Sequence, residues 1–189
     1  VAEMKLYSLM ENMMFEGYPY HNKTLLQAAR DQARIHGWGH VFMEDISHTK
    51  LTYSQFFNKI FVLGRKLAPL LNSQQHVGML LPNVSNAVVT FFAIQICKSV
   101  PAMINYTMGP KNVLSCCKAA CVKVIITSRK FIELANLSGL ITAIKDADIK
   151  ILYLEDIAKS IRFFDKIAGL LDRFSYKDTI DPDSGTVVL

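Results

Sequence analysis

His40 and Asp45 have the spacing in this sequence that most resembles a catalytic pair. In the arrangement H-x4-D, a histidine can deprotonate an acceptor hydroxyl while the carboxylate orients the imidazole ring. That chemistry needs a loop leading into a helix, whereas the intervening Val41-Phe42-Met43 predicts a strand. Five positions along a strand place two side chains on opposite faces. We therefore interpret this spacing as coincidental.

Metal-binding patterns are also weak. His36 and His40 are four residues apart, as on one helix face, but Gly37-Trp38-Gly39 disfavours a continuous helix between them. The four cysteines lack C-x2-C spacing and fall at apolar positions of predicted helices, so we expect buried thiols. They are Cys97, Cys116, Cys117 and Cys121. We predict no metal site in this chain.

The charged residues are unevenly distributed. The chain of 189 residues has 21 Lys and Arg and 16 Asp and Glu, a net charge of +5, yet residues 46–132 contain ten basic residues and no acidic one. This window indicates either a solvated lysine surface over a buried core or a positive face for an anionic partner. Such a partner would be a nucleotide phosphate, an acidic carrier protein or a membrane. The basic residues are too dispersed to predict a nucleic-acid partner.

Composition excludes several classes of protein. An apolar fraction of 51% excludes intrinsic disorder, and four irregularly spaced cysteines exclude a disulfide-stapled scaffold. The uncharged stretch Leu67–Cys97 is long enough to cross a bilayer, but Pro82 and Asn83 divide it into pieces of strand and helix length. We expect a buried strand and a buried helix there, in a soluble chain.

Hydrophobic periodicity predicts an α/β fold. An amphipathic helix within residues 1–23, a helix at 24–35, a hairpin around 41–53 and a helix at 54–70 come first. Four strand–helix pairs follow, at 76–81 and 85–97, 101–104 and 111–120, 122–127 and 130–144, and 149–154 and 157–174. A further strand is expected at 186–189. Short apolar strands between helices indicate a parallel, Rossmann-like sheet with helices on both faces. The sequence contains no G-x-G-x-x-G or P-loop motif.

Several segments, in order, resemble motifs of the adenylate-forming, acyl-activating (AMP-binding) enzymes. Residues 51–60 (LTYSQFFNKI) and 77–83 (VGMLLPN) together resemble the opening motif of that family. Residues 94–107 resemble its second motif, with Ser99 in place of the usual glycine. Residues 100–107, 125–133 and 151–156 are most similar to one branch. That branch comprises the bifunctional acyl-acyl carrier protein synthetases/2-acylglycerophosphoethanolamine acyltransferases of bacterial inner membranes.

The resemblance implies the N-terminal α/β subdomain of such an enzyme over residues 24–189, preceded by a helix or linker at 1–23. The subdomain would be truncated, because the family's phosphate-binding loop, a Ser/Thr/Gly run ending in Pro-Lys-Gly, would begin just after Leu189. Residues 184–186 (SGT) precede the last predicted strand, and residues 108–111 (MGPK) lack the preceding run. We therefore assign no catalytic and no cofactor-binding residue to this chain, and we expect it to be inactive alone.

For the whole protein, the resemblance implies that ATP and Mg²⁺ convert a fatty acid to an acyl-adenylate. The acyl group would pass to acyl carrier protein and then to a lysophospholipid, at the cytoplasmic side of the bacterial inner membrane and with peripheral membrane contact. The acid-free window would then offer a docking face for the acidic carrier, formed by Lys111, Lys118, Arg129 and Lys130. Two alternatives stay open: a non-catalytic α/β module that binds an acidic protein or membrane surface, and an unrelated Rossmann-like enzyme.

The last predicted helix, residues 157–174, carries an apolar stripe. Its members are Ile157, Ile161, Phe164, Ala168, Leu171 and Phe174. The simplest interpretation is that the stripe packs on the sheet. The alternatives are an interfacial membrane contact or contact with a neighbouring acyltransferase domain.

Overall fold

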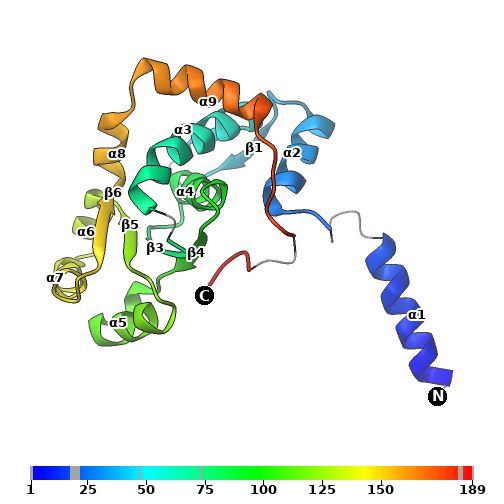
Figure 1. Cartoon of the computed structure of the whole chain (residues 1–189), viewed down its shortest axis with the longest axis horizontal. Coiled ribbons are helices and arrows are strands. Elements are labelled where there is room, and N and C mark those ends of the chain that lie inside the picture. Colours follow the sequence, from blue (N-terminus) through cyan, green and yellow to red (C-terminus); the bar gives the residue numbers. More distant parts are fainter. Residues whose placement is uncertain (1, 18–21, 47, 73, 183–184, 189) are drawn as a thin grey trace.

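The centre of the molecule is a parallel sheet of four strands in the order β4-β3-β5-β6. The computed structural model describes residues 2–17, 22–46, 48–72, 74–182 and 185–188 (Figure 1). The strands are β3 (His76–Leu80), β4 (Val100–Met103), β5 (Val124–Thr127) and β6 (Lys150–Tyr153). All four residues of β5 are buried, as short apolar strands covered on both faces require. The predicted α/β fold class is confirmed.

Helices cover both faces of this sheet (Figure 1). One layer contains α3 (Tyr53–Leu71), α4 (Ser85–Ile96) and α8 (Leu154–Ser160). The other contains α5 (Pro110–Ala119), α6 (Arg129–Leu134) and α7 (Ser138–Asp146). Helices α4 and α5 belong to different layers because their connections run in opposite directions along the sheet. The chain passes from β3 through α4 outward to β4, and then from β4 through α5 back across β3 to β5. Right-handed crossovers then place α4 and α5 on opposite faces.

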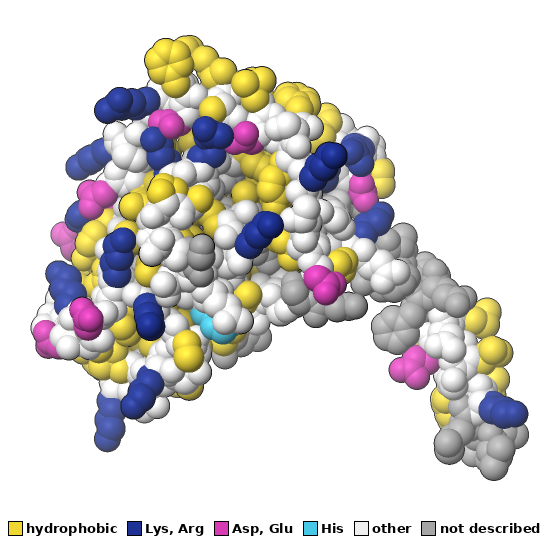
Figure 2. Space-filling model, viewed as in Figure 1, with side chains coloured by type: hydrophobic (Ala, Val, Ile, Leu, Met, Phe, Trp, Pro, Cys, Tyr) yellow, Lys and Arg dark blue, Asp and Glu magenta, His cyan; other side chains and the backbone are white. Residues whose placement is uncertain are grey.

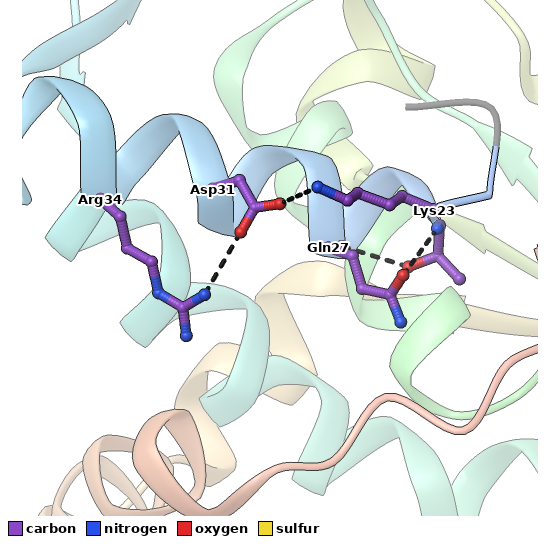
Figure 3. A network of polar contacts seen from close by, with 5 residues as sticks. Lys23, Gln27, Asp31 and Arg34 are labelled. Carbon is purple, nitrogen blue, oxygen red and sulfur yellow. Dashed lines mark hydrogen bonds and ion pairs between the residues drawn. The ribbon is translucent and has the colours of Figure 1, made fainter. Parts of the chain in front are cut away.

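The N-terminal region adds two helices and a hairpin. These elements are α1 (Ala2–Gly17), α2 (Leu25–His36), β1 (Val41–Glu44) and β2 (Lys50–Thr52), and the two strands pair antiparallel as predicted. Thr24 and Gln27 form a capping box at the start of α2. Asp31 of α2 forms ion pairs with Lys23, just before the helix, at 2.7 Å and with Arg34 at 3.2 Å (Figure 3). Figure 1 shows α1 extending away from the rest of the chain.

Two helices that the periodicity predicts as continuous are each broken in the structure. Residues 130–144 divide into α6 and α7 because Asn136 has a left-handed backbone (φ 51°) that ends the first helix. Residues 157–174 divide into α8 and α9 (Phe163–Ser175) because Ile161 and Arg162 are extended. The prediction that the stripe of the last helix packs on the sheet is therefore wrong for its second half. Ile157 is buried, whereas Phe164, Leu171 and Phe174 are exposed.

After α9 the chain runs back past α2 to the edge of the sheet. The side chains of Thr24 and Asp178 hydrogen-bond, and Arg30 donates to the carbonyl oxygen of Tyr176 at 3.3 Å. Val188 then pairs parallel with Ala102 in β4. The sequence predicts a strand at residues 186–189, and the described residues of this segment form only this one bridge. Leu189 lies outside the described residues. A short 3-10 helix, η1 (Tyr106–Met108), follows β4 on the way to α5.

Candidate functional site

The carboxyl edge of the sheet is the candidate functional site. In open parallel sheets, ligands bind outside the carboxyl ends of the strands, where neighbouring strands send their crossovers in opposite directions. Here β3 connects toward β4 at one side, while its neighbour β5 connects toward β6 at the other. The switch point therefore lies between β3 and β5. Residues 81–84, 104–109 and 128 follow the three nearest strands at this edge.

A cavity of about 500 Å³ opens at this edge beside the β1–β2 hairpin. It is lined mainly by apolar side chains from the ends of β3 and β4 and from α4, among them Met79, Met103 and Phe91. Asp45, at the end of β1, accepts a hydrogen bond from the N–H of Ser85, the first residue of α4, at 3.1 Å. Its carboxylate thus replaces a local cap at that helix N-terminus. The cavity offers an apolar wall, and its described lining includes no histidine, cysteine or basic residue.

The ends of β5 and β6 are fixed by a second carboxylate. Ser128 donates a hydrogen bond to Glu155 Oε1 at 2.9 Å, and the N–H of Lys130 donates to the same oxygen at 3.3 Å. Burial raises the pKa of the Glu155 carboxyl, but these bonds and those from the backbone N–H groups of Glu155 and Arg129 outweigh it and lower the pKa. Thr127, fully buried, donates to the Leu80 carbonyl at 2.8 Å and joins β5 to β3. These hydrogen bonds tie β3, β5 and β6 together at this edge, although Glu155 Oε2 is buried without a hydrogen-bond partner among the described residues.

Sequence reasoning considered Asp45 only as a partner of His40 and missed the contacts that both carboxylates make. Asp45 contacts Ser85 across 40 positions of sequence, and Glu155 contacts Ser128 across 27. Only the strand–helix order, which brings strand ends to one edge, signalled that such residues would meet.

The four predicted docking residues are all exposed, on two helices of one layer. Lys111 and Lys118 are on α5, and Arg129 and Lys130 are on α6; α7 contacts both helices. Arg129 donates two hydrogen bonds to Asp156, at 2.8 and 2.6 Å, which lower the pKa of that carboxyl. It also lies 4.0 Å from the centre of the Tyr153 ring. Arg129 is thus already partnered, whereas the three lysines form no ion pair with another described residue.

The histidine patterns of the sequence do not form a site. The predicted strand separates His40 from Asp45, and the His40 ring stacks 6.3 Å from that of Tyr53. The rings of His36 and His40 are 5.5 Å apart. Within the described ranges no three potential metal ligands converge.

The expectation of buried thiols is wrong for two of the four cysteines. Cys116 is exposed because α5 turns Val113 and Cys117, one helical turn apart, toward the core instead. Cys121, also exposed, lies beyond the end of α5 and has a left-handed backbone (φ 53°). Cys97 is half-buried and its thiol lies 3.3 Å from the Gly64 carbonyl oxygen; burial raises its pKa to about 12.

The described sheet, its helical layers and its carboxyl edge define the class of the N-terminal α/β subdomains of adenylate-forming enzymes. Residues 29–173 match the AMP-binding enzyme family, and the chain belongs to that family. No helix in the part of the chain that the structure describes has the length and apolar character needed to cross a bilayer.

Solved structures show the same fold at low sequence identity. The crystal structure of VinN matches with a TM-score of 0.68 at 15% identity, over 88% of this chain and 41% of that one. The Klebsiella oxytoca NpsA N-terminal subdomain, in complex with 3-hydroxybenzoyl-AMSN, matches with a TM-score of 0.65 at 11% identity, over 90% of this chain and 38% of that one. The inhibitor-bound N-terminal domain of FACL13 from Mycobacterium tuberculosis matches with a TM-score of 0.56 at 18% identity, over 71% of this chain and 34% of that one. The chain thus spans less than half the length of these proteins.

Proposed function

We propose that this chain is part of an ATP-dependent ligase that activates a carboxylic acid as its adenylate. Membership of the AMP-binding enzyme family carries the proposal. The sheet supports it, because the segment at Val188 runs parallel to β4 and so leads toward the carboxyl edge. A phosphate-binding loop that followed this segment would lie at the carboxyl edge of the sheet, where ligands bind in open α/β sheets.

In this proposal the chain supplies a wall of the site and the remainder of the protein supplies the phosphate contacts. The described lining of the cavity is mainly apolar, and its charged residues are the acids Glu44 and Asp45 with no cation, so it fits an acyl or ring group better than a triphosphate. Mg²⁺ and residues outside this chain would neutralise the phosphate charge of ATP. The role of Asp45 and Glu155 would be to hold the frame on which those residues are placed.

For the finer assignment, we propose a fatty acid as substrate, acyl carrier protein as the first acceptor and a lysophospholipid as the second. The motif resemblance at residues 100–107, 125–133 and 151–156 supports this branch of the family. The exposed Lys111, Lys118 and Lys130 support an acidic carrier as partner, since opposite charge steers association. The enzyme would act at the cytoplasmic side of the inner membrane.

Acid-dependent exchange of pyrophosphate into ATP tests the ligase proposal. The full-length protein containing this chain should catalyse exchange with long-chain fatty acids and less with acetate or aryl acids. The 189-residue chain alone should not. Exchange that is absent with every acid would overturn the ligase, and exchange with aryl acids alone would overturn the fatty-acid assignment. Carrier binding without exchange would favour the non-catalytic module instead.

Charge reversal tests the carrier-docking face. We expect the variant Lys111→Glu/Lys118→Glu/Arg129→Glu/Lys130→Glu of the full-length protein to bind acyl carrier protein about tenfold more weakly or worse, with a flatter salt dependence. The matched control reverses four exposed lysines outside α5 and α6. They are Lys5, Lys50, Lys59 and Lys98. An unchanged affinity in the first variant, or an equal loss in the control, would refute the assigned face.

A further inference from the structure

The outer face of α9 is a continuous exposed apolar surface. Six large apolar side chains of this 13-residue helix are each at least 41% exposed. They are Phe163, Phe164, Ile167, Leu170, Leu171 and Phe174. Their spacing places them on one side of the helix. Figure 2 shows hydrophobic side chains in a row along the top of the molecule, where α9 lies in Figure 1.

The opposite face of α9 is fixed on α3. Gly169 is buried against Val62, so closely that a Cβ there would lie 2.5 Å from a Val62 methyl group. Two ion pairs flank this contact, Arg65 to Asp172 at 2.8 Å and Lys66 to Asp165 at 2.7 Å. The helix is therefore held in one orientation, and its apolar face is preformed.

The charges around the helix are predominantly positive. Residues 159–177 contain five basic residues and two acidic ones, and both acids are those that pair with α3. Lys159, Arg162 and Lys166 are exposed at the N-terminal half of this segment and form no ion pair with the described residues. The margin of the apolar face thus carries positive charge that the acids of α9 do not neutralise.

An apolar groove of about 540 Å³ adjoins this face. It lies between α9 and helices α3, α4 and α8, and Leu170 lines both the groove and the outer face. Val62, Val89 and Ile161 are among its apolar walls, and Lys166 is one of its few charged residues. A volume in the range of ligand pockets, with apolar walls and a cation, suits part of a lipid chain below a phosphate headgroup.

We propose that the outer face of α9 docks on the surface of an anionic lipid membrane. The helix lies parallel to the bilayer, with its phenylalanine and aliphatic side chains among the headgroups and the first acyl carbons. Lys159, Arg162 and Lys166 face the lipid phosphates. An amphipathic helix with a purely apolar face and basic margins is the type that binds at this depth. The inference rests on the membrane location in the proposed function and assigns it to a surface of this chain, whereas the ligase chemistry does not depend on it.

Vesicle sedimentation with the full-length protein that contains this chain tests this surface. The protein should bind vesicles of phosphatidylcholine and phosphatidylglycerol more strongly than phosphatidylcholine alone, and salt should weaken the preference. The variant Phe163→Ser/Phe164→Ser/Leu171→Ser should lower the partition coefficient about tenfold or more. The matched control is Leu9→Ser/Met10→Ser/Met13→Ser, which removes three exposed apolar side chains from α1 and should bind as the wild type does.

A charge variant separates the two contributions. Arg162→Glu/Lys166→Glu should abolish the preference for anionic vesicles while circular dichroism shows an unchanged fold, since both side chains are exposed. Three outcomes would overturn the proposal: no binding of the wild-type protein to anionic vesicles, an equal loss in the α1 control, or a wild-type dimer that the α9 variant converts to a monomer. The last result would assign the face to self-association.

Discussion

Helices α3 and α9 show how the same local pattern can have opposite surroundings. Each is amphipathic, and each carries two adjacent phenylalanines. Phe56 and Phe57 of α3 are 1% and 0% exposed, whereas Phe163 and Phe164 of α9 are 71% and 78% exposed. The difference arises because α4, α9 and the N-terminal elements surround α3, while α9 contacts α3 with one face. Periodicity identifies the side chains that share a face, and the tertiary structure decides what covers it.

The sharpest test of this comparison is truncation of one phenylalanine in each helix. We expect Phe57→Ala to lower the free energy of unfolding by about 3–5 kcal/mol, because it leaves a cavity among fully buried aromatic side chains. The matched variant Phe164→Ala should change it by no more than about 0.5 kcal/mol. Urea unfolding followed by circular dichroism measures both values. Similar losses in the two variants would show that α9 is covered in solution.

The contact between the two helices is tested at Gly169. An alanine Cβ there would meet the backbone nitrogen of Val62 at 3.0 Å as well as its side chain, so α9 must shift. We expect Gly169→Ala to destabilise the chain by about 1–2 kcal/mol and to speed amide exchange in α9 while β3 and β5 stay protected.

The control for that variant is Gly139→Ala in α7, where a Cβ would meet nothing within 4 Å. It should be neutral or stabilising by up to about 1 kcal/mol, because alanine favours the helix. Equal effects at the two glycines would contradict the close packing of α9 on α3.

The smallest expected effect concerns the ion pair at the start of α9. The hydrogen bond from Lys66, and then that from the N–H of Arg162, lower the pKa of Asp165 below its ordinary 3.8. A lowered pKa in the folded state stabilises the fold above 3.8, and this contribution is lost as the pH falls through the lowered value. Asp165→Asn should thus be less stable than wild type at neutral pH, and the two should converge in acid. In a Lys66→Met background, the difference in stability between the protein with Asp165 and its Asp165→Asn variant should shrink. A difference in stability that persists at low pH would show that the ionised carboxylate of Asp165 is not its cause.

The sheet could be predicted from the sequence because its signals are local. Each strand is a short apolar run between helices, such as the fully buried β5. The breaks in the two long predicted helices could not be predicted from the sequence, because apolar spacing continues across Asn136 and across Ile161, where the backbone leaves the helix. The contacts of the two carboxylates at the carboxyl edge were also missed, since their partners are distant in sequence. Local periodicity carries no information about such pairs.

The pairing of Val188 with Ala102 also sets the order of events during synthesis. The ribosome must add 86 residues after Ala102 before the bridge to β4 can form. At about 5 to 20 residues per second, that delay is roughly 4 to 17 seconds. During this delay the outer edge of β4 lacks its pairing with Val188. An open strand edge is a template for pairing with other chains. We therefore expect a nascent chain stalled before Val188 to depend more on chaperones than one released after it.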